Sequence, residues 1–468
     1  MKAKLRFLGA AQNVTGSRHM LELDGTKILV DCGIYQERQF LSRNWEKFPV
    51  EPNTIDAVLL THAHLDHCGL LPKLVKEGFN GKIYCTNATA EIAKIILLDS
   101  AHIQEEDAAY KKKRHQKEGR KGPYPEEPLY TTEDAQAVFP LFSPIGYKQC
   151  KRLDETIEVC FYNAGHVLGS SIIKVTAKIK GKQRVILFTG DIGRPDRPIV
   201  EDPDCFEQAD YVVTESTYGD RTHEPTESIK DRLAALINEA YQRGGKIIIP
   251  SFALERSQEV LYYLNGLFLE EKIPPIKVFL DSPMAAKITD VFRHHPEMFD
   301  SEMKELLRNH ESPFDFPELN LTSSTDESKA LNELKGPYII IAGSGMCTGG
   351  RVKHHLANNI SDPATMVIFV GYQAIGTLGR RIVDGEDNIR ILGVERPVKA
   401  KIERVKGFSS HADRDELLQW LKNLKNPPRC VFVVHGEKES AESFANYVKE
   451  NAGFNTIVPE YQQEVTLD

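Results

Sequence analysis

The stretch THAHLDHCG, residues 61–69, constrains the fold most, because it places His62, His64, Asp66 and His67 within six positions. It follows the apolar run DAVLL, residues 56–60, which predicts a short buried strand. Imidazoles and carboxylates suit zinc, and a ligand-rich loop at the end of a rigid strand is a common place for a site. A polar surface loop is the alternative, but chance would seldom gather four such groups in a chain with 15 histidines. The stretch therefore predicts a metal site at a strand end.

Length and composition exclude several classes of protein. With 468 residues, the chain suggests two or three domains, each with its own core. Charged residues at 27% and hydrophobic residues at 41% are typical of a soluble globular protein. No signal peptide or membrane span is predicted, so we expect a cytoplasmic location and no membrane partner. The net charge of −8 opposes general adhesion to nucleic acid, so a phosphate-rich substrate would need local patches or metal.

The cysteines indicate a reducing environment. All eight are dispersed and no C-x-x-C pair occurs, so neither a disulfide framework nor a thiolate zinc site is predicted. We expect them to be core residues.

Strand and helix patterns alternate along the chain. KLRFLGA, SRHMLEL and TKILVDCG predict strands, with a hairpin turn at Asp24-Gly25, and residues 90–113 predict a long helix. A charged insertion follows at residues 111–128, KKKRHQKEGRKGPYPEEP. A solvated excursion is the favoured interpretation, and a basic lip for a polyanion is the alternative.

Two further ligand-type residues follow strand patterns. His166 lies in NAGHVLGSS, and Asp191 follows the apolar strand in RVILFTGDIG. A lone histidine beside glycine is more often structural than a ligand. Together with the first cluster, however, the set could hold two ions with a bridging carboxylate.

The motifs H-x-H-x-D-H, Gly-His and Thr-Gly-Asp resemble those of the metallo-β-lactamase superfamily, whose fold is an αββα sandwich with the motifs at one edge. Asp31, in KILVDCG, matches the first motif of that family, and the implied role is to orient the ligands. The resemblance implies that two zinc ions bind. His62, His64 and His166 would hold one, Asp66 and His67 the other, and Asp191 would bridge them.

The region after residue 208 resembles the β-CASP insertion of nucleic-acid-processing members, an α/β domain. Glu215 in TESTYG, His411 in FSSHADRDE and His435 in VFVVHGE match its motifs A, B and C. Asp191 and His411 are 220 positions apart (411 − 191), so the chain must leave the first domain and return to it. We expect the metallo-β-lactamase domain at residues 1–208 and 396–468, with the β-CASP domain at residues 209–395 and a cleft between them as the site.

The implied chemistry is phosphodiester hydrolysis that leaves a 5′-phosphate and a 3′-hydroxyl. His411 would donate a proton to the leaving oxygen with support from Glu215, and His435 would be a further zinc ligand. Asp66 and Asp31 complete the expected catalytic set. Substrate phosphate would be held by the side chains of Ser409, Ser410, Arg256 and Arg351, although each serine could equally serve a turn. Arg380 and Arg381 are further candidates, and AGSGMCTGG fits a phosphate cradle better than a dinucleotide site.

Histidine at motif C is typical of RNA-directed members, so we expect a zinc-dependent ribonuclease that acts on single-stranded RNA. The nearest likeness is to bacterial and archaeal relatives of the nuclease subunit of the cleavage and polyadenylation specificity factor. Cleavage could be internal, stepwise from the 5′ end, or both. The resemblance is compatible with a homodimer and with an RNA-processing or degradation complex. Alternatives are a small-molecule hydrolase of the thioesterase or lactamase type, a DNA-directed nuclease, and a metal-free RNA-binding scaffold.

Overall fold

The chain forms two compact units in the computed structural model, which describes residues 3–119, 122, 124–223, 228–374 and 376–468. Unit 1 comprises Met1–Arg197, Asp202–Thr222 and Ser410–Asp468, and unit 2 comprises Pro198–Glu201 and His223–Ser409. The chain thus leaves unit 1 and later returns to it. The main boundaries, after Thr222 and after Ser409, fall later than the expected ones at residues 208 and 395, because β11 (Tyr211–Thr214) pairs within unit 1 and β19 (Lys401–Arg404) pairs within unit 2.

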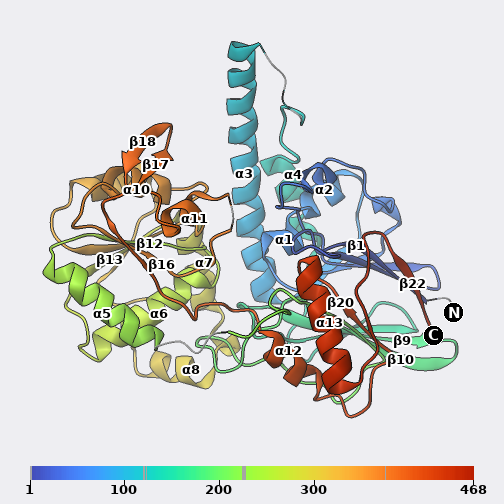
Figure 1. The fold of residues 1–468 in the computed structure, drawn as a ribbon. Helices are drawn as coiled ribbons and strands as arrows, with labels where there is room; N and C mark the ends of the chain where they lie inside the picture. The colour runs from blue at the N-terminus through green and yellow to red at the C-terminus, as the bar shows by residue number, and fades with distance from the viewer. Residues whose placement is uncertain (1–2, 120–121, 123, 224–227, 375) are drawn as a thin grey trace. The chain divides into compact units, whose positions relative to one another are not determined.

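Unit 1 contains two seven-stranded sheets (Figure 1). The first has the order β22 (Glu464–Leu467), β1 (Ala3–Gly9), β2 (Arg18–Leu23), β3 (Thr26–Val30), β4 (Ala57–Leu59), β5 (Lys82–Cys85) and β6 (Phe142–Pro144). The second has the order β21 (Thr456–Ile457), β20 (Cys430–Val433), β11, β10 (Lys182–Phe188), β9 (Ser171–Ile179), β8 (Ile157–Asn163) and β7 (Cys150–Arg152).

The strands at the centre of the second sheet are buried on both faces, which explains their continuous apolar sequence. Successive side chains of a strand point to opposite faces. Ile186 and Phe188 of β10 accordingly join the core between the two sheets, whereas Leu187 packs with α12 (Arg414–Leu421) and α13 (Lys438–Ala452). Helix α3 (Asn87–Glu118) contacts β6 of the first sheet, so helices flank both sheets and the predicted sandwich is confirmed.

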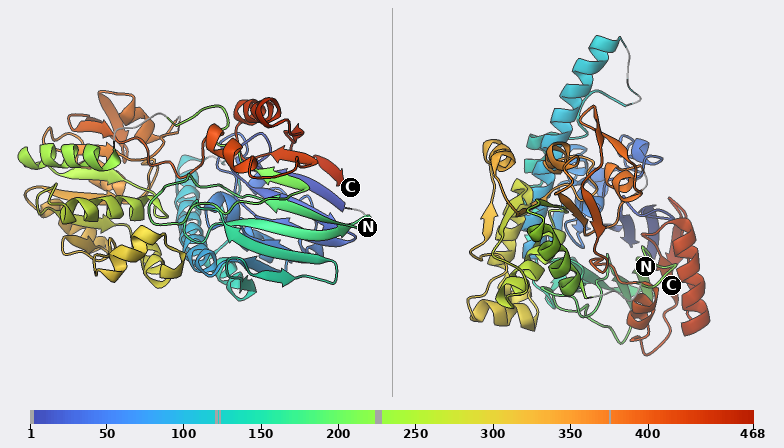
Figure 2. Two further views of the ribbon diagram at one scale, coloured as in Figure 1. Left: turned by 90° about the horizontal axis from the view of Figure 1, so that it is seen from below. Right: turned by 60° about the vertical axis from the view of Figure 1, so that its left-hand side comes forward.

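The predicted hairpin is present between β2 and β3. Leu23 pairs with Thr26, which leaves Asp24 and Gly25 as the two turn residues, both with positive φ. The sequence patterns did not reveal β22, which pairs antiparallel with β1 and brings the two ends of unit 1 side by side (Figure 2).

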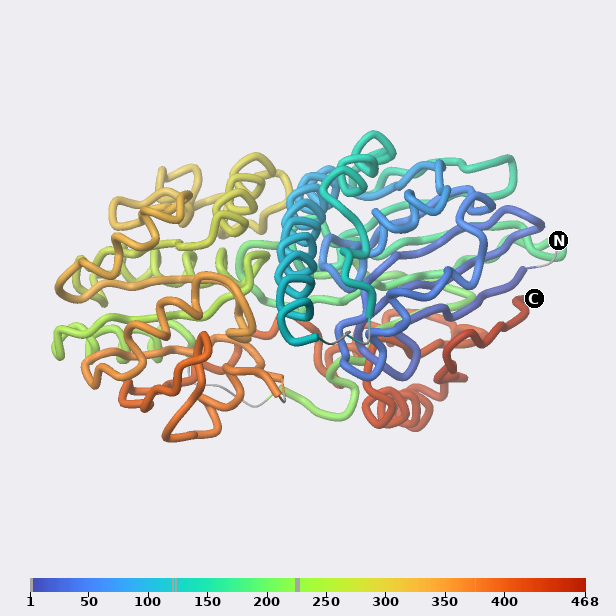
Figure 3. Tube along the Cα trace, turned by 90° about the horizontal axis from the view of Figure 1, so that it is seen from above, coloured from blue at the N-terminus to red at the C-terminus, as the bar shows by residue number. Residues whose placement is uncertain are grey.

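The predicted long helix is α3 (Asn87–Glu118), a continuous helix of 32 residues (Figure 3). Thr86 caps its first turn by accepting a hydrogen bond from the Thr89 amide, and Gly119 ends it in the left-handed conformation. The last two turns carry the basic run that begins at Lys111, while Arg120, Lys121 and Pro123 lie outside the described residues. No helix in the described part of the chain is both long enough and apolar enough to cross a bilayer.

The expectation for the cysteines was wrong at three positions. Cys150 and Cys160 face each other on β7 and β8 and form a disulfide, and Cys205 is exposed. Cysteines on adjacent antiparallel strands can form a disulfide at a short sequence separation, and this arrangement does not require C-x-x-C spacing. The other five cysteines are buried thiols.

Unit 2 is built on a six-stranded sheet whose paired strands are all parallel. Its order is β14 (Leu319–Leu321), β13 (Lys277–Asp281), β15 (Tyr338–Ala342), β12 (Ile247–Pro250), β16 (Met366–Phe369) and β19. From β12 the chain crosses β15 through α6 (Arg256–Leu269) to reach β13, whereas from β15 it crosses β12 through α10 (Val352–Asn359) to reach β16. The strand order therefore reverses between β12 and β15.

Candidate active site

The predicted ligands of unit 1 converge because each follows the carboxyl end of a strand or starts a helix beside one. Strands β3 and β4 run parallel in the first sheet, and β10, β11 and β20 run parallel in the second. Parallel strands end at the same sheet edge, so the residues that follow them gather there. This edge holds Asp31, His62, His64, Asp66, His67, Asp191, Glu215 and His435, and the β8–β9 turn adds His166.

The first cluster consists of His62, His64, His166 and Asp191. His64 Nδ1 lies 3.0 Å from His62 Nε2 and 3.3 Å from His166 Nε2. The Asp191 Oδ2 atom lies 3.4 Å from His62 Nε2 and 3.5 Å from His166 Nε2. Three ring nitrogens and one carboxylate oxygen therefore point at a common centre.

The second cluster consists of Asp66, His67 and His435. The Nε2 atoms of His67 and His435 are 3.1 Å apart, and His435 Nε2 lies 3.5 Å from Asp66 Oδ2. Asp191 takes part here as well, because its Oδ1 atom lies 3.4 Å from His67 Nε2. The two oxygens of Asp191 thus face different clusters.

Charge and desolvation make these clusters suited to a cation. Burial together with neighbouring imidazoles lowers the pKa of His62, lowers that of His64 to about 3 and lowers that of His166 strongly, so these rings stay neutral and keep a lone pair. Burial also disfavours a proton on His67 and His435, but the Asp191 carboxylate and other nearby carboxylates outweigh it and raise the pKa of both. The carboxylates that favour a proton on these buried imidazoles would also favour a metal ion that binds the imidazoles in place of the proton.

A further observation supports the fit to metal. The Asp191 side chain is buried, and within the described residues no hydrogen bond of good geometry reaches its Oδ1 atom, whose neighbouring ring nitrogens are His67 Nε2 at 3.4 Å and His435 Nδ1 at 3.5 Å. A buried carboxylate oxygen normally has a donor or a cation beside it, since leaving it alone is costly. Neutral imidazoles and carboxylates in tight groups are also the donors that zinc prefers. These seven residues can hold a metal ion.

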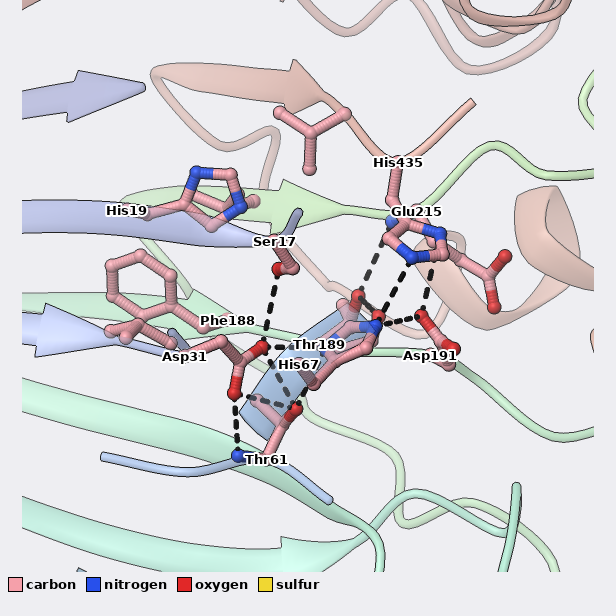
Figure 4. A pocket seen from close by; sticks show the side chains of 14 residues that line it. Ser17, His19, Asp31, Thr61, His67, Phe188, Thr189, Asp191, Glu215 and His435 are labelled. Carbon is pink, nitrogen blue, oxygen red and sulfur yellow. Dashed lines mark hydrogen bonds and ion pairs between the residues drawn. The ribbon is translucent and has the colours of Figure 1, made fainter. Parts of the chain in front are cut away.

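Asp31 lies beside the second cluster and contacts His67 and Thr61. It follows β3 with positive φ, and its Oδ1 atom accepts hydrogen bonds from the Thr61 amide at 2.8 Å and from the Thr61 hydroxyl at 3.0 Å. Its Oδ2 atom lies 2.7 Å from His67 Nδ1 (Figure 4). A proton on Nδ1 leaves Nε2 of His67 directed at the second cluster, which is the usual role of a carboxylate behind a histidine ligand.

His411 and Glu215 form a pair next to Asp191. His411 Nδ1 lies 3.1 Å from both oxygens of Glu215 and 4.0 Å from Asp191 Oδ2. Glu215 is held in turn by the Ile192 amide, which donates to its Oε1 atom at 2.8 Å. Burial would lower the pKa of His411, but the carboxylates of Glu215 and Asp191 outweigh burial and raise it to about 9. The imidazole therefore carries a proton at neutral pH.

Sequence inspection missed several supporting residues. Thr217 donates a hydrogen bond to the His435 carbonyl at 3.1 Å, and its hydroxyl lies 3.2 Å from His435 Nδ1. Ser17 and His19 line a cavity of about 10 Å³ behind the clusters, close to the volume of one water molecule (Figure 4). The position of Thr61 at the start of the histidine motif, and of Thr217 two residues after Glu215, was the only signal for these hydroxyls.

The expected phosphate-binding residues differ in their surroundings. The Ser410 carbonyl lies 3.4 Å from His166 Nδ1, so its main chain helps to orient a ligand. Ser409 ends unit 2. Arg256 pairs with Glu259 at 2.7 Å and Arg351 with Asp281 at 2.6 Å, both carboxylates being buried. Arg380 and Arg381 pair with Asp384 and Glu386, respectively.

Comparison with known protein families gives three matches along the chain. A metallo-beta-lactamase superfamily domain matches residues 20–190, a Beta-Casp domain matches residues 257–382, and a Zn-dependent metallo-hydrolase RNA specificity domain matches residues 395–459.

Individual relatives match over most of the chain. Ribonuclease TTHA0252 of Thermus thermophilus is 37% identical, with 92% of each chain covered. The RNase J-like protein of Methanocaldococcus jannaschii is 31% identical, with 97% of each chain covered. Transcription termination factor FttA of the same organism is 32% identical over 97% of this chain and 70% of its own length. A protein of unknown function from Enterococcus faecalis V583 shares the fold, with a TM-score of 0.58 and 13% identity over the whole of both chains.

Proposed function

We propose that this chain, which belongs to the metallo-beta-lactamase superfamily and within it to the proteins with a Beta-Casp domain, is a metal-dependent ribonuclease that hydrolyses phosphodiester bonds of single-stranded RNA. Relatives whose names describe ribonucleases, and the match to an RNA specificity domain at residues 395–459, support RNA as the substrate. The observation that carries the proposal is the position of His411 beside the ligand clusters, with Nδ1 3.1 Å from both oxygens of Glu215 and 4.0 Å from Asp191 Oδ2, because hydrolysis of an RNA phosphodiester needs both a charged site for phosphate and a proton donor.

We propose two zinc ions as the cofactor. One would be held by His62, His64 and His166 and the other by Asp66, His67 and His435, with Asp191 between them. When bound, the metal supplies Lewis acidity, which makes water a nucleophile near neutral pH and offsets charge on the phosphate oxygens.

The residues of the chain would move the proton that the reaction needs. A water molecule loses one proton to solvent as its oxygen forms a bond to phosphorus, and the bond from phosphorus to the ribose 3′-oxygen breaks. Through solvent, the proton lost by the water replaces the one that His411 gives to the leaving oxygen. That oxygen is a poor leaving group, so His411 would donate the proton to it from Nε2, while Glu215 holds Nδ1 and stabilises the imidazolium. The products are a 5′-phosphate and a 3′-hydroxyl.

The mode of cleavage forms part of the proposal. We infer internal cleavage, with stepwise removal from the 5′ end as a second activity of the same site. We also propose a cytoplasmic location, which the six free thiols favour, although the Cys150–Cys160 disulfide is of a kind that is rare in a reducing compartment.

The direct experiment compares substrates at one enzyme concentration. Zinc-loaded protein is incubated with a 5′-labelled single-stranded RNA, a circular RNA, a DNA of the same sequence and acyl-glutathione. We expect cleavage of both RNAs, with 5′-phosphate ends on the products. Hydrolysis of acyl-glutathione without cleavage of RNA would instead assign the site to a small-molecule hydrolase, and preference for DNA would contradict RNA as the substrate.

A further inference from the structure

Two aromatic side chains are exposed at the carboxyl edge of the unit 2 sheet. Phe252 follows β12 and is 41% exposed, and Tyr372 follows the neighbouring strand β16 and is 57% exposed. A single exposed apolar residue is common at protein surfaces, but two exposed rings that follow neighbouring strands form a patch, which more often marks a binding site. The two rings stand on adjacent parallel strands, so they emerge at the same end of the sheet.

Their position is the one where parallel sheets usually bind ligands. The chain leaves β12 toward β13 and leaves β15 toward β16, so the connections after these two neighbouring strands run in opposite directions along the sheet. Ligands of open parallel sheets bind at such a reversal of strand order, beyond the carboxyl ends of the strands. Phe252 lies in the first of these connections, and the glycine-rich segment at residues 343–350 begins the second.

The backbone at Gly345 and Gly371 supports the Phe252 ring. A Cβ atom on Gly345 would lie 2.7 Å from the Phe252 ring, and one on Gly371 would lie 3.8 Å from it, so the ring rests against both glycines. The amide of the buried Gln373 ties these positions together, donating to the Gly345 carbonyl at 3.0 Å and to the Gly371 carbonyl at 3.2 Å. Ser257 fixes the loop from below, since its hydroxyl donates to the Phe252 carbonyl at 2.7 Å.

We propose that Phe252 and Tyr372 form an aromatic platform on which bases of single-stranded RNA stack. The inference rests on the proposed ribonuclease function and adds a binding site in unit 2 to it. Stacking on aromatic rings tolerates any base, because every base has a π face, and a rigid scaffold under the ring lowers the entropy lost on binding.

The charges at this edge favour bases over phosphates as the group recognised. The arginines of the surrounding loops and helices are already paired with carboxylates, as described for Arg256, Arg351, Arg380 and Arg381. The whole chain has a net charge of −8 and offers little long-range attraction to a polyanion. Uncharged contact with the bases is therefore the interaction that the Phe252 and Tyr372 rings can supply.

The test measures binding of a fluorescent oligoadenylate by anisotropy in EDTA, which prevents cleavage. Phe252→Ala and Tyr372→Ala should each weaken binding about 5- to 150-fold, the range that loss of one stacked base gives. Tyr372→Phe should bind like the wild type, because the ring remains. The slope of log Kd against log salt should stay the same in all variants, since no phosphate contact is removed.

Tyr241→Ala is the matched control. Tyr241 is 38% exposed in the last turn of α5 (Ile229–Gln242), which leads into β12 and so lies toward the amino edge of the same sheet. The Tyr241→Ala variant should bind oligoadenylate with the same affinity as the wild type. An abasic oligomer of the same length should bind the wild type and the Phe252 and Tyr372 variants equally.

Four outcomes decide between the platform and the proposed function. Equal binding of oligoadenylate by Phe252→Ala and Tyr241→Ala would overturn the platform. An equal loss on oligoadenylate and on the abasic oligomer would also overturn it, because the rings would then not contact bases. A wild-type protein that neither binds nor cleaves RNA would overturn the proposed function itself, whereas RNA cleavage with unaffected variants would overturn the platform alone.

Discussion

At the scale of single residues, Asp191 has the largest share in the site, because its two oxygens face different ligand clusters. The Oδ2 atom lies near His62 and His166, and the Oδ1 atom lies near His67. Its carboxylate also helps to keep His411 protonated. Removal of this side chain should therefore disturb metal binding and proton donation together.

We expect Asp191→Ala to lose both zinc ions and nearly all activity toward RNA and toward bis(p-nitrophenyl) phosphate. Elemental analysis of protein purified without chelator measures the metal, which we expect at about two ions per wild-type chain. Asp107→Ala is the control, since Asp107 is 66% exposed on α3. A fully active wild-type enzyme with one metal ion per chain would contradict the bridging role of Asp191.

Replacement of His411 should have a different effect from replacement of a metal ligand. His411→Ala should lower RNA cleavage about 10²- to 10⁴-fold, the range for general acid catalysis, and keep its zinc. On bis(p-nitrophenyl) phosphate the loss should be small, because the departing phenolate needs no proton. Glu215→Gln should show the same pattern more weakly, whereas His435→Ala should lose zinc and impair both substrates. His102→Ala, at an exposed position of α3, serves as the control.

If His411→Ala loses activity equally on RNA and on bis(p-nitrophenyl) phosphate while it retains zinc, the general-acid role of His411 is contradicted. Its protonated imidazole would then act by positioning the phosphate, which an increase in KM with little change in kcat would reveal.

At the scale of elements, the motifs predicted which residues meet, and the topology explains why. The histidine motif and Asp191 follow apolar strand patterns, so their convergence at a sheet edge could be expected from the sequence. The surroundings of Arg351 could not, since its partner Asp281 is 70 positions away and ends a different strand. The Cys150–Cys160 disulfide and β22 could not be predicted either, because the sequence of one strand does not identify the strand that pairs with it.

Asp281 links several elements of unit 2 and should be important for its stability. It ends β13 and is fully buried, and it accepts hydrogen bonds from Ser328 of α9 (Thr325–Ala330) at 2.6 Å, from Arg351 at 2.6 Å and from Thr322. His355 of α10 lies 2.5 Å from its Oδ2 atom. Burial would raise the pKa of Asp281, but these four hydrogen bonds outweigh burial and hold it well below the usual range.

Asp281→Asn should lower the free energy of unfolding of unit 2 by about 3–5 kcal/mol at pH 7, as for other buried pairs that lose one partner. A carboxylate with a depressed pKa adds stability above its unfolded value, near pH 4, and loses it as pH falls toward the folded value. The difference between wild type and variant should therefore shrink below about pH 4. Hydrogen exchange of the β12 and β15 amides measures this difference in the free energy of unfolding. Asp326→Asn, at a 96% exposed position of α9, should change little.

At the scale of the whole molecule, the chain passes through unit 1, enters unit 2 and returns, and the ligands come from both parts of this path. The first segment of unit 1 supplies His62, His166 and Asp191, and the last segment supplies His435. A metal ion held by Asp66, His67 and His435 would therefore join segments on either side of the insertion. Its binding free energy should stabilise unit 1, whereas the ligand-free core of unit 2 should gain nothing directly.

This difference can be measured, because both tryptophans of the chain, Trp45 and Trp420, lie in unit 1. Removal of zinc with a chelator should lower the melting temperature seen by tryptophan fluorescence, since a ligand at 100 times its Kd adds about 2.7 kcal/mol to stability. Hydrogen exchange of β12 and β15 in unit 2 should stay the same, and added zinc should restore the fluorescence transition. Asp191→Ala should melt like the chelated wild type and not respond to zinc. Loss of protection in β12 and β15 on chelation would mean that the two units unfold together, so the metal would then stabilise the chain as one cooperative body.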